Sequence, residues 1–178
     1  MKVTILGCGT SGGVPRIGPL WGRCNPDNPK NRRRRVSILV EDRDTSLLVD
    51  TSPDLREQCL DAGVNHLDGV LYTHDHADHT HGIDDLRGIA HAMGRKVDIF
   101  ANEETLSVLR QRFGYVFESV AGYPAITNPH VITGPVRVGG IDVLPFEQIH
   151  GPITSLGFRF RPVAYSTDLN ALPEESFD

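Results

Sequence analysis

The stretch Thr73-His74-Asp75-His76-Ala77-Asp78-His79 follows directly on the apolar run Gly69-Val70-Leu71-Tyr72. Three imidazoles and two carboxylates fall within six consecutive positions of it. Histidine nitrogens and aspartate oxygens together suit zinc, manganese or iron. An isolated histidine is more often a surface or core residue than a ligand, but packing gives no reason to gather five such groups at the end of a buried strand. The stretch therefore predicts a metal site.

The spacing within this stretch indicates two ions. His74 and His76 are separated by one residue, so in an extended segment both side chains leave the same face and can bind one ion. Asp78 and His79 follow after a turn and project elsewhere, which fits a second ion beside the first. Two ions about 3.5–4 Å apart can clamp and activate a water between them.

The pattern His74-x-His76-x-Asp78-His79 after a hydrophobic strand resembles the signature of the metallo-β-lactamase superfamily of binuclear metallohydrolases. The wider chain is similar to this family in its order of motifs, which are Gly7–Pro15, Leu48–Arg56, His150-Gly151-Pro152 and Tyr165-Ser166-Thr167-Asp168. The set most resembles the branch that contains the cyclic phosphodiesterase of the carbon–phosphorus lyase pathway, and ribonuclease Z is a more distant relative.

The resemblance assigns roles to residues outside the central stretch. A histidine at a strand-to-loop break, His150, would complete the first site with His74 and His76. Asp168 resembles the carboxylate that bridges both ions, so the second site would comprise Asp78, His79 and Asp168. Asp50 ends an apolar strand, where the family places an acid that hydrogen-bonds a ligand histidine. The competing interpretations are a plain turn aspartate at Asp168 and a surface strand-end aspartate at Asp50.

The resemblance also implies the fold, an α/β protein with the αββα sandwich of the metallo-β-lactamase type. The length of 178 residues argues for a single domain over residues 1–178. The family normally takes another histidine ligand and the last part of its sandwich from further downstream, but no histidine follows His150. We therefore expect a domain that lacks its C-terminal part, with an incomplete second site and no assigned general acid.

Hydrophobic patterning predicts the remaining elements. Strands are expected at residues 3–6, 36–40, 46–50, 69–72, 97–101, 136–138, 141–146, 156–160 and 163–166, and helices at 53–62, 82–93 and 103–113. Ser52 reads as the N-cap of the first helix, followed by Pro53 at its first position. Residues 115–135 lack clear periodicity, so a lid or a substrate-facing loop is one interpretation.

Three further features leave alternatives open. Gly7-x-Gly9-x-x-Gly12 formally matches a dinucleotide fingerprint, but the glycines and prolines of 13–19 prohibit the helix that this motif needs. The loop is then either a flexible turn or a backbone segment beside the metals. The run Arg32–Arg35 is either a solvated turn or a phosphate clamp. Cys24 with Asp27 makes a poor structural zinc site, so none is predicted.

The composition of the chain narrows the classes of partner and the compartment that we expect for it. A formal net charge of −5 argues against a general nucleic-acid binder. The three cysteines suggest no disulfide framework, which fits a cytoplasmic protein. No stretch approaches the roughly 20 apolar residues of a membrane span. A small phosphate-ester or nucleotide substrate is expected, and a homodimer is possible.

These observations converge on a binuclear hydrolase that cleaves a small (cyclic) phosphodiester or a nucleotide. Two divalent ions, zinc or manganese, would make water acidic enough to lose its proton near neutral pH, and the hydroxide would attack phosphorus in line. Asp78 would orient that hydroxide as well as bind metal. The alternatives are thioester or lactam hydrolysis by the same metals, and a metal- or nucleotide-binding domain without turnover.

Overall fold

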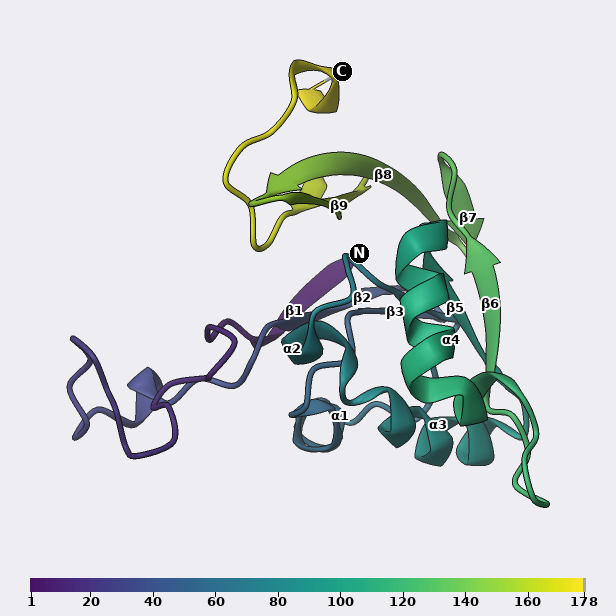
Figure 1. Cartoon of the computed structure of the whole chain (residues 1–178), viewed down its shortest axis with the longest axis horizontal. Coiled ribbons are helices and arrows are strands. Elements are labelled where there is room, and N and C mark those ends of the chain that lie inside the picture. Colours follow the sequence, from purple (N-terminus) through teal and green to yellow (C-terminus); the bar gives the residue numbers. More distant parts are fainter. Residues whose placement is uncertain (178) are drawn as a thin grey trace.

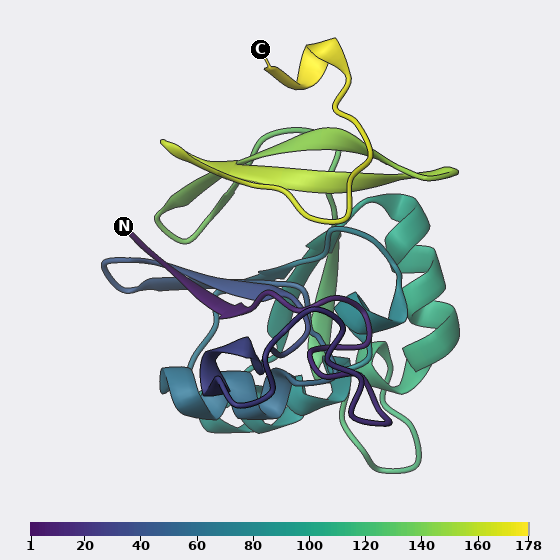
Figure 2. The same ribbon diagram turned by 90° about the vertical axis from the view of Figure 1, so that its left-hand side faces the viewer.

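A computed structural model of the chain describes residues 1–177, and it stacks two β-sheets face to face (Figure 1, Figure 2). The first sheet has the strand order β1-β2-β3-β4-β5-β6, and the second has the order β10-β9-β8-β7. The first sheet consists of β1 (Lys2–Gly7), β2 (Ser37–Asp42), β3 (Thr45–Val49), β4 (Gly69–Leu71), β5 (Val97–Ala101) and β6 (Thr127–Val131). The second consists of β7 (Val136–Val138), β8 (Ile141–His150), β9 (Ile153–Phe160) and β10 (Val163–Tyr165).

The helices lie mainly on the outer face of the first sheet, which gives successive layers of helix, sheet and sheet (Figure 1). They are α1 (Leu55–Ala62), α2 (Ala77–Thr80), α3 (Leu86–Met93) and α4 (Glu103–Phe117), with short 3₁₀ turns η1 (Pro29–Asn31), η2 (Ile83–Asp85) and η3 (Glu174–Phe177). This is the predicted α/β sandwich. Among residues 1–177, only η3 and its approach lie over the second sheet, and no α-helix covers it. No helix in the same range is long and apolar enough to cross a bilayer.

The direction of the strands decides where functional residues gather. β3, β4, β5 and β6 are parallel, so each is joined to the next by a crossover that carries helices. β4 is buried on both faces, with Val70 in the core under the helices and Leu71 in the core between the sheets. Because parallel strands place their carboxyl ends at one edge of the sheet, the segments after β3 and β4 meet there.

The core between the sheets sets the position of the second sheet over that edge. Phe158 and Phe160 of β9 are fully buried against Val49 and Leu71 of the first sheet. The backbone N–H of Leu156 also donates to the carbonyl oxygen of Thr73 at 2.8 Å, which ties β9 to the segment after β4. The end of β8 is thereby brought next to the predicted metal segment.

Two predictions about helix boundaries were wrong. α1 begins at Leu55 rather than at Pro53, and its N-cap is Asp54 rather than Ser52. The Ser52 hydroxyl donates to Gln58 Oε1 at 2.9 Å, and its oxygen accepts from the Asp54 N–H at 3.2 Å, ahead of the helix. The predicted helix over 82–93 is split into the 3₁₀ turn η2 and the helix α3.

The lid interpretation of residues 115–135 is not supported by their position. α4 continues to Phe117, and β6 (Thr127–Val131) adds a parallel strand at the edge of the first sheet. The loop between them lines a groove beside α1 and α3, on the helical side of the molecule and away from the predicted metal ligands. This segment lacked a strand signal because Asn128 and Pro129 are rare in strands, and the proline is tolerated here because β6 is an edge strand.

The glycine-rich loop after β1 is fastened to the backbone of the arginine run. The N–H of Gly9 donates to the carbonyl oxygen of Arg34 at 2.7 Å, and a Cβ on Gly9 would approach that oxygen to 2.7 Å. Val14 and Arg33 exchange two backbone hydrogen bonds further along the loop. The glycine is therefore required by close backbone approach, and the loop is a fixed segment.

Two of the four arginines direct their guanidinium groups to acidic side chains beside or on α1. Arg34 pairs with Asp61 at 2.5 Å, and Arg35 Nε lies 3.1 Å from Asp54 Oδ2. Neither residue contacts the metal segment, so the structure does not support the phosphate-clamp interpretation for this pair.

Gly82 docks the segment that follows α2 against the segment that follows β3. Its N–H donates to the carbonyl oxygen of Thr51 at 2.9 Å, and the Thr51 N–H donates to the carbonyl oxygen of His79 at 2.8 Å. A Cβ at Gly82 would lie 2.0 Å from the carbonyl oxygen of Ser52. The two segments can therefore pack this closely only if residue 82 has no side chain.

We expect Gly82→Ala to lower the free energy of unfolding by about 3 kcal/mol or more, because the clash is with backbone that cannot move cheaply. Gly88→Ala is the matched control, since Gly88 lies in α3 with open space around it and alanine is favoured there by about 1 kcal/mol. Urea denaturation of both variants measures the effect. A Gly82→Ala protein as stable as the wild type would contradict this packing.

Candidate metal centre

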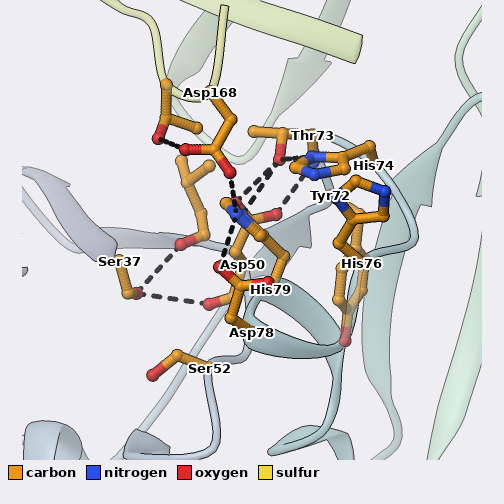
Figure 3. Close-up of polar contacts among 12 residues, drawn as sticks. Ser37, Asp50, Ser52, Tyr72, Thr73, His74, His76, Asp78, His79 and Asp168 are labelled. Carbon is orange, nitrogen blue, oxygen red and sulfur yellow. Dashed lines mark hydrogen bonds and ion pairs between the residues drawn. The ribbon is translucent and has the colours of Figure 1, made fainter. Parts of the chain in front are cut away.

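The structure brings all six predicted ligands together at the carboxyl edge of the first sheet. Figure 3 shows how His74, His76, Asp78, His79 and Asp168 lie there. The polar atoms of two sets lie within 4.8 Å of one another, and these sets are His74, His76 and His150, and His74, His79 and Asp168. Asp78 joins them, because its Oδ2 lies 3.4 Å from His79 Nε2. The central stretch supplies four of the residues after β4, whereas β8 and the segment after β10 supply the other two.

His74 is held with one ring nitrogen free. Thr73 Oγ1 donates to Asp50 Oδ2 at 2.8 Å, which leaves its oxygen to accept from His74 Nδ1 at 2.9 Å. His74 Nε2 is then the unprotonated nitrogen, and it is buried without a hydrogen-bond partner. Burial, together with the nearby charge of His79, lowers the pKa of His74 to about 4. A neutral, buried and unsatisfied nitrogen is what a metal ligand requires.

His79 is surrounded by carboxylates. Its Nδ1 donates to Asp50 Oδ2 at 2.7 Å, and its Nε2 lies 3.0 Å from Asp168 Oδ2. Burial alone would lower the pKa of His79, but the charges and hydrogen bonds of Asp50, Asp168 and Asp78 outweigh it and raise the pKa to about 12. The hydrogen bond from His79 in turn lowers the pKa of Asp168 to about 2. The pocket therefore favours positive charge, which fits a divalent cation.

Asp50 and Asp168 both adopt left-handed backbone conformations, with φ of 62° and 52°. Such values are uncommon outside glycine, and aspartate is among the residues that tolerate them best. Asp50 is fully buried, and its N–H donates to the carbonyl oxygen of Leu71 at 2.8 Å. The turn therefore carries the Asp50 carboxylate from the end of β3 beneath the segment after β4, where it contacts His79.

His76, His150 and Asp168 face a cavity of about 450 Å³. His150 Nε2 lies 3.2 Å from His76 Nδ1, and both rings are more exposed than His74 and His79. Thr10 and Ser11 of the glycine-rich loop line the same cavity, as expected if that loop lies beside the metals. One side of the centre is thus buried and rigid, and the other is open to a small ligand.

Three other polar residues that follow α2 in the chain, His81, Arg87 and His91, lie outside the centre. His81 belongs to neither of the two clusters, and its ring packs edge-on against Phe113 with centroids 5.5 Å apart. Arg87 and His91 line the groove of about 1140 Å³ beside α1 and α3, so they do not face the cavity at the metal centre. Arg87 is engaged with Asp84 at 3.0 Å.

Sequence reasoning missed the groups that position the ligands. Thr73 orients His74, as described above. Gln148 is fully buried, and its Nε2 donates to Ser155 Oγ at 3.1 Å and to the carbonyl oxygen of Thr167 at 3.2 Å. Its Oε1 accepts from Ser166 Oγ, so this amide fixes the segment just before Asp168. The sequence offered no clear signal for Gln148, because it lies between Glu147 and His150 in the polar end of β8.

A family model described as the beta-lactamase superfamily domain matches residues 45–178. The chain is 36% identical to a diphosphatase from the PhnP family, with a TM-score of 0.87 over 98% of this chain and 67% of that one. The short form of human tRNase Z is 17% identical, with a TM-score of 0.67 over 99% of this chain and 72% of that one, and this likeness shows the fold alone.

A curated protein of Porphyromonas gingivalis named octanoyltransferase is 35% identical over 182 residues. The match covers 100% of this chain and 37% of that protein. The chain therefore spans little more than a third of the length of this relative.

The metal-free protein is expected to lose stability as the pH falls from 6.5, the ordinary pKa of histidine, to about 4, the pKa of His74 in the folded state. Between these values the unfolded chain binds a proton at residue 74 that the folded chain does not bind, so acid favours unfolding. A shift of this size corresponds to a loss on the order of 3 kcal/mol.

His74→Gln cannot titrate at this position, so its stability should depend less on pH over the same interval. Urea denaturation in the presence of a chelator, at several pH values between 4 and 7, compares the two proteins. Parallel curves would contradict a neutral, acid-sensitive His74.

Proposed function

The chain belongs to the beta-lactamase superfamily, as its histidine motif predicted, and we propose that it hydrolyses a small phosphate ester with the help of two divalent cations. One observation carries the proposal. Two clusters of nitrogen and oxygen ligands share a buried histidine and open onto one cavity of ligand size. The substrate proposed is a phosphodiester, either a small cyclic one or a nucleotide.

The residues present fit two cations. His74, His76 and His150 would hold the first, because the buried Nε2 of His74 has no other partner. Asp78, His79 and Asp168 would hold the second, with the Asp168 carboxylate shared between them. Mixed imidazole and carboxylate ligands suit zinc and manganese alike.

The protein's own groups prepare the reaction. Cations in these positions would lower the pKa of a coordinated water and neutralise charge on the phosphoryl oxygens. Asp78 is half-buried beside His79, and we assign to its carboxylate the orientation of the attacking water. Asp50 holds His79 through Nδ1, so that only Nε2 can face the reacting groups. Burial of His74 and His79 keeps bulk water from the inner side.

The cavity supports a small substrate. A volume of about 450 Å³ accommodates a nucleotide-sized ligand rather than a long segment of polymer. The hydroxyl-bearing residues Thr10 and Ser11 offer hydrogen bonds at its wall. The similarity to a diphosphatase of the PhnP family supports cleavage at phosphorus.

Thioester hydrolysis is the second candidate function. It is favoured by one observation, the 35% identity to a protein named octanoyltransferase. The match covers only 37% of that protein, so its activity need not belong to the matched part. The chemistry is nevertheless compatible, because cations held by the same ligands could polarise a thioester carbonyl. Parallel assays of bis(p-nitrophenyl) phosphate, an octanoyl thioester and a chromogenic lactam separate the candidates.

We expect the purified chain to bind two equivalents of zinc or manganese, measured by elemental analysis after removal of free metal. His150→Ala should lower the content toward one, because only the first cluster contains this imidazole. Ala77 lies on α2 but offers no ligand, so Ala77→Ser is the matched control and should keep two. Absence of metal from the wild-type chain at micromolar zinc would refute the proposal.

Asp78→Asn should reduce turnover of bis(p-nitrophenyl) phosphate by a factor of about 100 or more, because the amide keeps the shape but not the charge of the carboxylate. The melting temperature should stay close to that of the wild type. Asp84→Asn is the control, since Asp84 is an exposed carboxylate engaged with Arg87. Full activity of Asp78→Asn would exclude the role assigned to this carboxylate.

A further inference from the structure

The helix α4 changes direction where it passes the metal segment. Phe113 has φ of −129° and ψ of 37°, which are not helical values, although α4 continues from Glu103 to Phe117. Consecutive residues of a regular helix point in different directions around its axis. The kink lets two consecutive side chains, Arg112 and Phe113, contact the same neighbouring segment.

Arg112 contacts Asp75, which lies between His74 and His76 of the first cluster. Its Nη1 donates to the carbonyl oxygen of Asp75 at 2.5 Å, and its Nη2 donates to Asp75 Oδ2 at 3.0 Å. One guanidinium thus fixes both the backbone and the side chain of Asp75. The planar geometry of arginine makes such a two-point contact directional, which lysine cannot reproduce.

Phe113 contacts the other end of the metal segment. Its ring packs edge-on against His81, which directly follows α2. α2 contains only four residues, and a helix this short is not stable without tertiary contacts. Its position must therefore be set by contacts from elsewhere in the fold. The two residues, called the α4 brace below, touch the segment on both sides of α2.

We infer that the α4 brace positions the metal ligands, and that Arg112 is a positioning residue for the cluster of His74, His76 and His150. The inference rests on the proposed metal centre. His74 and His76 can reach one ion together only if the backbone between them is fixed, since ligand distances tolerate only about 0.2 Å. Arg112 fixes that backbone at Asp75, and it also holds the Asp75 carboxylate in an ion pair.

Stability alone does not account for this contact. The side chains of Arg112 and Asp75 are 42% and 26% exposed, and ion pairs this accessible contribute little to folding. The same helix has a second exposed ion pair that serves as a control, because Arg110 lies 3.7 Å from Glu103 and the two side chains are 45% and 68% exposed. The Arg110 pair does not involve the metal segment, so it separates a general helix effect from a positioning effect.

The test compares Arg112→Ala, Arg112→Lys and the control Arg110→Ala. Zinc affinity is measured by competition with a chromogenic chelator, ligand geometry by the visible absorption of the cobalt-loaded protein, and folding by the melting temperature without metal. We expect Arg112→Ala to weaken the binding of zinc to the cluster of His74, His76 and His150 about 10-fold and to alter the absorption spectrum of the cobalt-loaded protein. Arg112→Lys should fall between Arg112→Ala and the wild type, and Arg110→Ala should match the wild type.

The outcomes are separable. Unchanged zinc affinity and cobalt spectrum in Arg112→Ala would overturn the inference, as would an equal loss in Arg110→Ala. If Arg112→Ala does not fold, Arg112→Lys decides the question by the same two readings. A wild-type chain that binds zinc but cleaves no phosphodiester would refute the proposed hydrolysis and leave the brace standing. If the wild-type chain cleaves the phosphodiester but its zinc affinity does not change in Arg112→Ala, the proposed hydrolysis stands and the α4 brace is refuted.

Discussion

The metal centre depends on one buried carboxylate. Asp50 has no exposed surface, and burying a charge is costly unless hydrogen bonds replace the lost water. Its oxygens accept from the Thr73 N–H, the Thr73 hydroxyl and His79 Nδ1 at 2.7–2.8 Å. These bonds join the end of β3 to the segment after β4. Through Thr73 they also set the orientation of His74, so one group fixes a histidine of each cluster.

The electrostatics of the centre follow from this arrangement. Carboxylates converge on His79 and raise its pKa, whereas burial lowers the pKa of His74. The same pocket thus keeps one imidazole neutral and gathers negative charge around the other. A cation bound at His79 Nε2 would have to displace a proton, which would couple its affinity to pH. Such a cation would enter a site in which the hydrogen bonds of Asp50 to Thr73 and His79 are already formed.

The two sheets contribute unequally to the centre. The first sheet and α2 supply the buried ligands, while β8 and the segment after β10 bring His150 and Asp168 from the second sheet. Gln148 holds the latter segment through Ser166 and Thr167. The centre can therefore form only when the sheets are packed together, and the aromatic residues of β9 between them serve function as well as stability.

The sequence alone determined the metal segment, the family and most strands, because ligand spacing and hydrophobic period are local properties of the chain. It did not determine the partners of Arg34 and Arg35, which lie far from them in sequence. It also missed the start of α1 and the strand β6, whose Asn128 and Pro129 are rare in strands. The convergence of His150 and Asp168 on His74 was expected from resemblance, and only the packed sheets decided it. The role of Asp50 was likewise expected from the resemblance, and its hydrogen bond with His79 confirms it. The roles of Gln148 and Arg112 were not predicted, because a polar side chain gains its role from the groups that folding places around it.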